Sequence, residues 1–257
     1  MTEPTLRRSY RIARRAGKQG ARSAEVSVLA SVFEKSATEP NSRLLKCKRT
    51  TTISTFNVRT LNSENQLPEL TASAAAQNID VICVQEHRLY HNDLELKYHE
   101  AGNGWTFISA SSWKNTMNST IGGVGMLLSP LALKSLNSIE KIVPRMIIAT
   151  FNGNPRTTII SCYSPTNVSD ETDVITFYQE LSSLIHHVPK HNVLVVGGDM
   201  NAHVGRTEEH KYTYHQSTNR NGEHMLDFAT ENGLACLNTQ FQKKEGQVMD
   251  TYTSKWS

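Results

Sequence analysis

The apolar run at 193–196, which leads into Gly-Gly-Asp-Met-Asn at 197–201, constrains the fold more than any other segment of this chain. Consecutive Val and Leu residues favour a buried β-strand. The two glycines remove side chains where the backbone turns or approaches a ligand. Asp199 and Asn201 lie two residues apart, so they can share one face at the end of this strand.

Two other apolar strands also end in polar residues. Asn57 follows Ile-Ser-Thr-Phe at 53–56, and Glu86 follows Val-Ile-Cys-Val-Gln at 81–85. Cleavage of a phosphodiester requires a metal ion to neutralise the phosphate, a positioned water and help for the departing oxygen. Side-chain oxygens at strand ends are suited to that chemistry, because Mg²⁺ prefers oxygen ligands.

Each candidate also has a purely structural interpretation. Asn57 could be a strand-end turn residue, Glu86 a solvated cap, and Asp199 with Asn201 an Asx-type turn. Tyr163, in the β-rich run at 157–163, could be a half-buried strand aromatic. Together these interpretations require four coincidences. His87 and His203 adjoin the candidates, and we interpret them as hydrogen-bond partners rather than catalytic groups.

The order of the predicted elements indicates an α/β fold. Strand–helix–strand units at both ends and hairpin-like strands in the middle predict a four-layer α/β sandwich of two packed mixed sheets with outer helices. Met225, Phe228 and Leu234 are predicted core residues. The predicted strands are 52–58, 80–85, 105–110, 123–128, 139–151, 157–163 and 192–196, and the predicted helices are 67–78, 170–187 and 221–232.

A length of 257 residues suits one main domain. We expect residues 1–49 to form a basic, disordered tail with a transient helix around 23–35, and residues 50–257 to form the domain. The net charge is only +3, because an excess of acidic residues after the tail offsets the positive charge that is concentrated in it. Such a tail can attract nucleic acid through counterion release, although we favour a simple solvated segment.

The four cysteines form no Cys-x-x-Cys pair, which indicates a reducing compartment. No apolar run reaches the roughly 20 residues that span a bilayer, so we expect no membrane partner. We expect an intracellular and nuclear protein, while the Arg-rich stretch at 7–15 would also suit a mitochondrial presequence.

Four motifs occur in one order along the chain: Phe-Asn-Val-Arg at 56–59, Val-Gln-Glu-His at 84–87, Cys-Tyr-Ser-Pro-Thr at 162–166 and Gly-Asp-Met-Asn-Ala-His at 198–203. With them the chain resembles the endonuclease/exonuclease/phosphatase superfamily. Gly-Gly-Val-Gly at 122–125 and the segment at 219–228 resemble endonuclease domains of non-LTR (LINE-type) retrotransposons and craniofacial development protein 2-like proteins.

The resemblance implies a Mg²⁺-dependent DNA endonuclease that nicks one strand, with Mn²⁺ as a second choice of metal. It implies that Glu86 is the main metal ligand and that Asn57 helps to orient the metal site. It further implies that Asp199 activates the attacking water, that Asn201 contacts the scissile phosphate, and that Tyr163 binds phosphate or assists the leaving oxygen.

In the family the pattern continues with a strand that contains a site Asp and with a Ser-Asp-His-like element, whereas this chain ends at Ser257. We therefore expect the domain to lack its last strands and its turnover to be poor. Two alternatives remain. One is an impaired remnant that binds nucleic acid or protein, and the other is a phosphatase for inositol phosphates or phospholipids.

Overall fold

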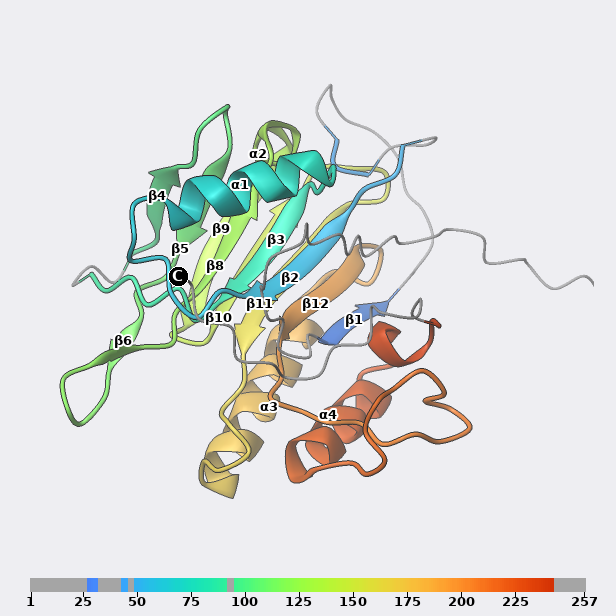
Figure 1. The fold of residues 1–257 in the computed structure, drawn as a ribbon. Coiled ribbons are helices and arrows are strands. Elements are labelled where there is room, and N and C mark those ends of the chain that lie inside the picture. The colour runs from blue at the N-terminus through green and yellow to red at the C-terminus, as the bar shows by residue number, and fades with distance from the viewer. Residues whose placement is uncertain (1–26, 32–42, 46–48, 92–94, 243–257) are drawn as a thin grey trace, which may run out of the picture.

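Two β-sheets face each other in the computed structural model, which describes residues 27–31, 43–45, 49–91 and 95–242 (Figure 1). The first sheet has the order β13-β1-β12-β11-β10-β9 and the second β2-β3-β8-β5-β4, and β6 pairs with β7 in a separate ribbon. Both sheets are mixed, since β11–β12 and β2–β3 are parallel and the other pairs are antiparallel.

The strands of the first sheet are β1 (Ser27–Ser31), β9 (Leu136–Val143), β10 (Met146–Phe151), β11 (Thr157–Tyr163), β12 (Val193–Asp199) and β13 (Ala235–Cys236). Those of the second sheet are β2 (Ile53–Asn57), β3 (Val81–Gln85), β4 (Lys97–Glu100), β5 (Thr106–Ser109) and β8 (Val124–Leu128), and the ribbon is β6 (Trp113–Lys114) with β7 (Thr120–Ile121). The helices are α1 (Gln66–Ala76), α2 (Pro130–Ser135), α3 (Glu171–His186), α4 (Arg220–Glu231) and the 3-10 helix η1 (Leu237–Thr239).

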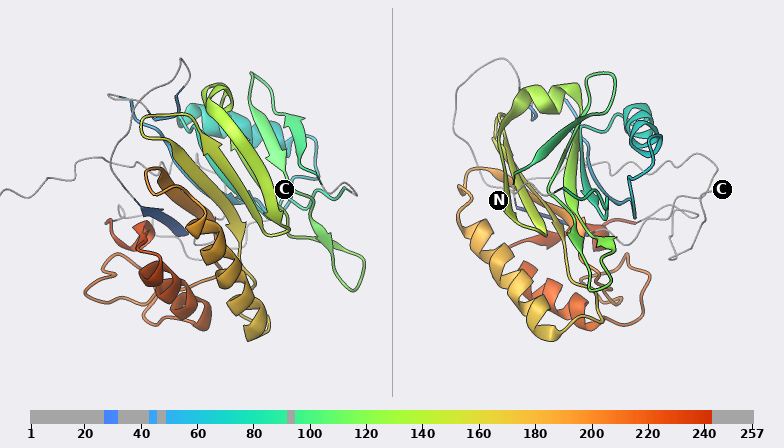
Figure 2. Two further views of the ribbon diagram at one scale, coloured as in Figure 1. Left: turned by 180° about the vertical axis from the view of Figure 1, so that it is seen from behind. Right: turned by 90° about the vertical axis from the view of Figure 1, so that its left-hand side faces the viewer.

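Helices cover the outer faces of the sheets. The right-hand view of Figure 2 shows α1 on one side of the molecule and α3 with α4 on the other. The predicted four-layer α/β sandwich is therefore confirmed.

Alternation along the strands explains the continuous apolar runs. In β12, Val193 and Val195 pack between the two sheets, whereas Leu194 and Val196 pack against α3 and α4. In β3, Val81 and Cys83 likewise face the other sheet, while Ile82 and Val84 lie under α1. Successive side chains of a strand point to opposite faces of the sheet. Here helices cover one face and the second sheet covers the other, so neither face of these strands is polar.

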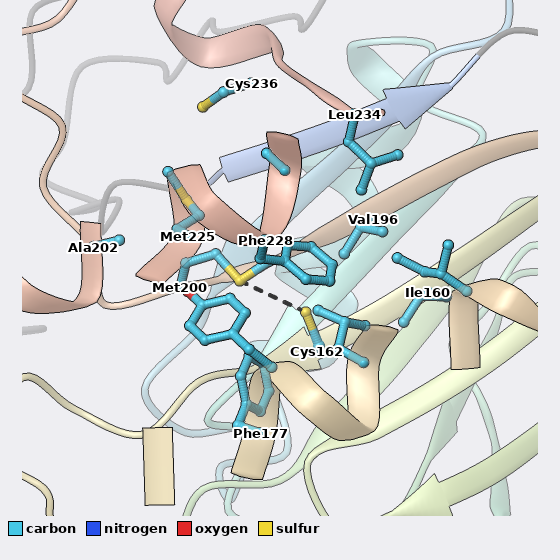
Figure 3. Packing of buried hydrophobic residues seen from close by; sticks show 14 of the residues in the cluster. Ile160, Cys162, Phe177, Val196, Met200, Ala202, Met225, Phe228, Leu234 and Cys236 are labelled. Carbon is cyan, nitrogen blue, oxygen red and sulfur yellow. Dashed lines mark hydrogen bonds between the residues drawn. The ribbon is translucent and has the colours of Figure 1, made fainter. Parts of the chain in front are cut away.

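The layer between the first sheet and its helices contains the predicted core residues Met225, Phe228 and Leu234 (Figure 3). The sulfur atoms of Cys162 and Met200 lie 3.9 Å apart within it. Cys83, Cys162 and Cys236 are buried free thiols, as expected for cysteines that act as small hydrophobes. Cys47 lies outside the described residues.

The three predicted helices are present. Asn219 caps α4 by accepting a hydrogen bond from the Gly222 N–H at 2.8 Å, and Gly233, at φ +62°, follows its C-terminus. The predicted strand at 139–151 is instead the two strands β9 and β10, because Pro144 cannot donate a ladder hydrogen bond and marks a turn between them.

Strand β1 differs from the prediction. The transient helix expected around 23–35 is wrong for Ser27–Ser31, which pairs antiparallel with both β12 and β13. This pairing satisfies backbone groups at the edge of β12 that would otherwise be open. The assignment of the rest of residues 1–49 to a tail stays a prediction.

Gly197 lets the two sheets approach each other near the ends of β12 and β3. A Cβ atom at Gly197 would lie only 2.7 Å from the Sγ of Cys83 on the facing sheet. The parallel pairs β2–β3 and β11–β12 both end at this edge, with Asn57 opposite Gln85 and Tyr163 opposite Asp199. The motif residues of both sheets therefore meet there.

Candidate active site

A hydrogen-bonded network joins the two sheets at the carboxyl ends of the strands β2, β3, β11 and β12. The Asn57 Nδ2 donates to Glu86 Oε1 at 2.7 Å and to Asp199 Oδ2 at 2.9 Å. The Tyr163 hydroxyl also donates to Glu86 Oε1, at 2.9 Å. Four predicted site residues, separated by up to 142 positions in the chain, thus form one cluster.

The backbone of Glu86 is in the left-handed region, with φ 55°. Such conformations cost energy in residues other than glycine and often occur at functional sites. Two loop hydrogen bonds hold it: the Glu86 N–H donates to the Gly123 carbonyl at 2.9 Å, and the Arg88 N–H donates to the Gly122 carbonyl at 3.0 Å. The glycine motif at 122–125 therefore supports the turn that presents the Glu86 carboxylate.

His87 points away from this network and into the protein. Its Nε2 donates to the Val124 carbonyl at 3.2 Å, and its Nδ1 accepts from the Leu89 N–H at 3.0 Å. Burial lowers the pKa of His87 to about 4, so the ring is neutral near pH 7. The interpretation of His87 as a hydrogen-bond partner is confirmed. His203 stacks on His215, with ring centroids 3.8 Å apart.

Tyr163 lies against two groups that the sequence did not indicate. The guanidinium of Arg145 sits 4.5 Å from the Trp113 ring and 5.5 Å from the Tyr163 ring, and it donates to the Tyr163 carbonyl at 3.2 Å. Burial, and then the charge of Glu86, raise the pKa of the Tyr163 phenol. Tyr163 is therefore a proton-bearing donor at neutral pH. Pro144, beside Arg145, was the only sequence signal for the turn that places this arginine.

Asp199 and Asn201 form a tight turn after β12. The Asn201 N–H donates to Asp199 Oδ1 at 2.9 Å, and Asn201, at φ 47°, is left-handed. The Asn201 side chain donates to the Ser164 carbonyl at 2.9 Å. An Asx-type turn is thus present, and it aims the other Asp199 oxygen at Asn57. The structural interpretation of this motif is confirmed, and the catalytic roles of Asp199 and Asn201 stay predictions.

The segment at 219–228 joins this turn to α4. The Asn219 Oδ1 accepts from the His203 N–H at 2.9 Å, and Asn221 Nδ2 donates to the Pro165 carbonyl at 2.9 Å. These contacts tie the start of α4 to the loops that follow both β11 and β12. The segment thus has a positioning role.

The Glu86 carboxylate is a suitable ligand for a divalent cation that prefers oxygen. Mg²⁺ is usually held by one or two carboxylates, with waters and substrate phosphate completing the shell. The Glu86 side chain is 19% exposed, and its Oε2 contacts only the exposed end of Arg88 at 3.2 Å among the interactions of the described residues. No cluster of three or more His, Cys, Asp or Glu side chains suited to a metal ion occurs in that part of the chain.

Asn57 is oriented with its nitrogen toward the two carboxylates and its oxygen toward the Arg59 N–H, at 3.0 Å. It therefore orients Glu86 and Asp199 in this arrangement, and direct ligation through its oxygen stays a prediction. No helix in the described ranges is both long and apolar enough to traverse a membrane.

Comparison with known proteins defines the class. Residues 54–229 match the Endonuclease/Exonuclease/phosphatase family, and this chain belongs to that family of hydrolases. Among curated proteins, it is 28% identical to craniofacial development protein 2 of Tragulus javanicus over 222 residues, which cover 85% of this chain and 37% of that protein. The same protein of Bos taurus is 28% identical over 217 residues, covering 83% and 35%. The chain thus spans little more than a third of the length of these relatives.

Two solved structures resemble this chain, and the first of them shows the same fold. The 3' phosphatase NExo from Neisseria, bound to product DNA hairpin, has a TM-score of 0.50 at 17% identity, over 69% of this chain and 70% of that chain. The AP endonuclease LMAP from Leishmania major has a TM-score of 0.48 at 14% identity, over 70% and 65%.

Proposed function

We propose that this chain is a Mg²⁺-dependent DNA endonuclease domain that nicks one strand. The observation that carries the proposal is the network in which Asn57 bridges Glu86 and Asp199 across the two sheets. This network gives a carboxylate suited to a metal and a second carboxylate suited to a water at one strand edge. Mn²⁺ is the alternative metal.

The residues divide the work of phosphodiester hydrolysis between them. Glu86 would hold a Mg²⁺ ion, which would supply positive charge against the phosphate. Asp199 holds a water and accepts its proton. Tyr163 keeps its proton, since its pKa is raised, and its hydroxyl turns from Glu86 Oε1 to donate a hydrogen bond to a phosphate or leaving oxygen. Asn57 fixes the two carboxylates relative to each other.

The kinship to retrotransposon endonuclease domains is part of the same proposal. The segments at 122–125 and 219–228 carry that resemblance, and they contact the turn at Glu86 and the loop that follows Asp199. A DNA substrate also suits the nuclear location that we expect, although the Arg-rich stretch at 7–15 would equally suit a mitochondrial presequence.

A non-catalytic nucleic-acid-binding module is the second candidate. It is favoured because both Glu86 oxygens already accept hydrogen bonds from the protein: Oε1 from Asn57 and Tyr163, and Oε2 from Arg88. A carboxylate neutralised in this way can be structural rather than reactive.

Nicking of supercoiled plasmid separates the two candidates. With Mg²⁺, the unaltered chain should convert supercoiled DNA to the open circle, and EDTA should stop it. Glu86→Gln and Asp199→Asn should each lower the rate by about 10²-fold or more, as removal of a catalytic group does. Glu180→Gln, an exposed change on α3, is the matched control. Equal nicking by all four proteins would point to a contaminating nuclease and refute the proposal.

A further inference from the structure

A surface next to the candidate site joins an exposed aromatic ring to an exposed cation. Tyr90 follows Glu86 by four residues and is 46% exposed. The Nζ of Lys114, at the base of the β6–β7 hairpin, lies 4.8 Å from the centre of its ring. We refer to Tyr90 and Lys114 as the Tyr90–Lys114 platform.

Hydrogen bonds fix the platform to the loop that carries Glu86. The Ser112 N–H donates to the Leu89 carbonyl at 3.0 Å, and the Ser111 Oγ accepts from the His91 N–H and donates to the His91 carbonyl at 3.0 and 2.7 Å. These bonds flank Tyr90 on both sides. The platform therefore moves with the site rather than as a free loop.

The same hairpin also contacts Tyr163. Trp113, adjacent to Lys114, packs against the Tyr163 ring with centroids 6.3 Å apart. Figure 1 shows the hairpin projecting away from the body of the sheets, and Met117 at its tip is 80% exposed. Any polymer that enters the site and continues in this direction meets the hairpin.

The chemistry of the platform suits a nucleic-acid strand. One side of the Tyr90 ring faces an ammonium group, and Lys114 forms no salt bridge within the described residues. A free cation binds phosphate, and an exposed aromatic ring stacks an unpaired base. Two further cationic side chains lie on loops next to the site: Arg59 follows β2 and Arg88 follows β3.

We propose that the Tyr90–Lys114 platform binds unpaired DNA next to the phosphodiester in the site, with a base on Tyr90 and its phosphate at Lys114. A paired base would keep its faces within the duplex stack, so the platform favours single-stranded or locally opened DNA. This proposal rests on the proposed function for its substrate class but not on catalysis.

Fluorescence anisotropy with a labelled single-stranded oligonucleotide, in EDTA, tests binding apart from cleavage. Tyr90→Ala should weaken binding by about 5- to 150-fold, the range for one stacked base, and Tyr90→Phe should retain it. Lys114→Gln should lower the salt dependence by about 0.7 in slope, as for one phosphate contact on a single strand.

Matched controls use an exposed tyrosine and an exposed lysine elsewhere. Tyr98 on β4 is 60% exposed, and Lys190 precedes β12 at the end opposite to the site. Tyr98→Ala and Lys190→Gln should bind as the unaltered chain does. Thermal unfolding of every variant identifies any that has lost its fold, and Tyr90→Leu provides a second non-aromatic variant.

Equal effects of Tyr90→Ala and Tyr98→Ala, or equal losses for single-stranded DNA and a blunt duplex, would overturn the platform. Plasmid nicking in the same proteins separates the two proposals. Tyr90-dependent binding without nicking by the unaltered chain would support the platform and refute the proposed function. Nicking with no selective loss at Tyr90 would do the reverse.

Discussion

Gly197 sets the distance between the sheets beside the site, and Gly197→Ala tests this directly. The added Cβ would meet Cys83 Sγ at 2.7 Å and Cys83 Cβ at 3.3 Å, while Thr55 Cβ at 3.7 Å is an ordinary contact. The clash is therefore confined to one side chain. Removing the sulfur with Cys83→Ala should relieve most of it.

The magnitudes follow from packing. Overpacking by one methyl group costs about 1–3 kcal/mol, and the lower flexibility of alanine in the unfolded chain offsets about 0.4–1 kcal/mol of that. Cys83→Ala alone removes one buried heavy atom and should cost about 1 kcal/mol. The double variant should lose only about 1 kcal/mol, so the two changes should couple by about 1–2 kcal/mol.

Urea unfolding of the unaltered chain, the two single variants and the double variant gives the coupling free energy. The nicking rates of the same proteins show whether the change in sheet spacing affects Asp199, two residues further along β12. Gly198→Ala is the control, since its Cβ would meet the backbone carbonyl of Cys162, which no change at Cys83 relieves. Additive free energies of unfolding for Gly197→Ala and Cys83→Ala would refute the argument that Gly197 sets the sheet spacing.

Three other residues give independent predictions. Asn57→Leu removes the hydrogen-bond donor that Glu86 and Asp199 share. It should lower the free energy of unfolding in urea by about 2–3 kcal/mol and abolish nicking. A loss below about 0.5 kcal/mol would contradict the bridging role of Asn57. Burial lowers the pKa of His87 to about 4. Between about pH 6.5 and about pH 4 only the unfolded chain takes up the proton, so the free energy of unfolding should fall by about 3 kcal/mol as the pH drops through this range. His87→Asn should remove this pH dependence. The raised pKa of Tyr163 stabilises the fold below the ordinary phenol pKa of about 10. The cost of Tyr163→Phe should therefore stay constant up to about pH 9 and shrink as the pH rises above about 10, and a cost that does not change with pH would argue against a buried, protonated phenol beside Glu86.

Local signals predicted much of the fold and the site. The apolar strands, the three long helices and the buried Met225, Phe228 and Leu234 follow from periodicity, which depends on near neighbours in the chain. Asn57, Glu86, Tyr163 and Asp199 were identified because polar groups at the ends of apolar strands are uncommon, and because their motifs occur in family order. Their individual catalytic roles stay predictions.

Other features depended on contacts between distant segments. Ser27–Ser31 became a strand because it pairs with β12 and β13, and such pairing leaves no local pattern. Arg145, Trp113 and Tyr163 come together from three separate parts of the chain, so no motif contains all three.

The sequence by itself determined which strands would be buried and that polar groups would follow them, since burial on both faces requires apolar residues at every position. Only the tertiary structure decided that Gly197 would bring the sheets close enough for one Asn57 amide to reach both Glu86 and Asp199. The reason is physical: a hydrogen bond acts over about 3 Å, and a separation that small between residues 142 positions apart is set by the packing of two whole sheets.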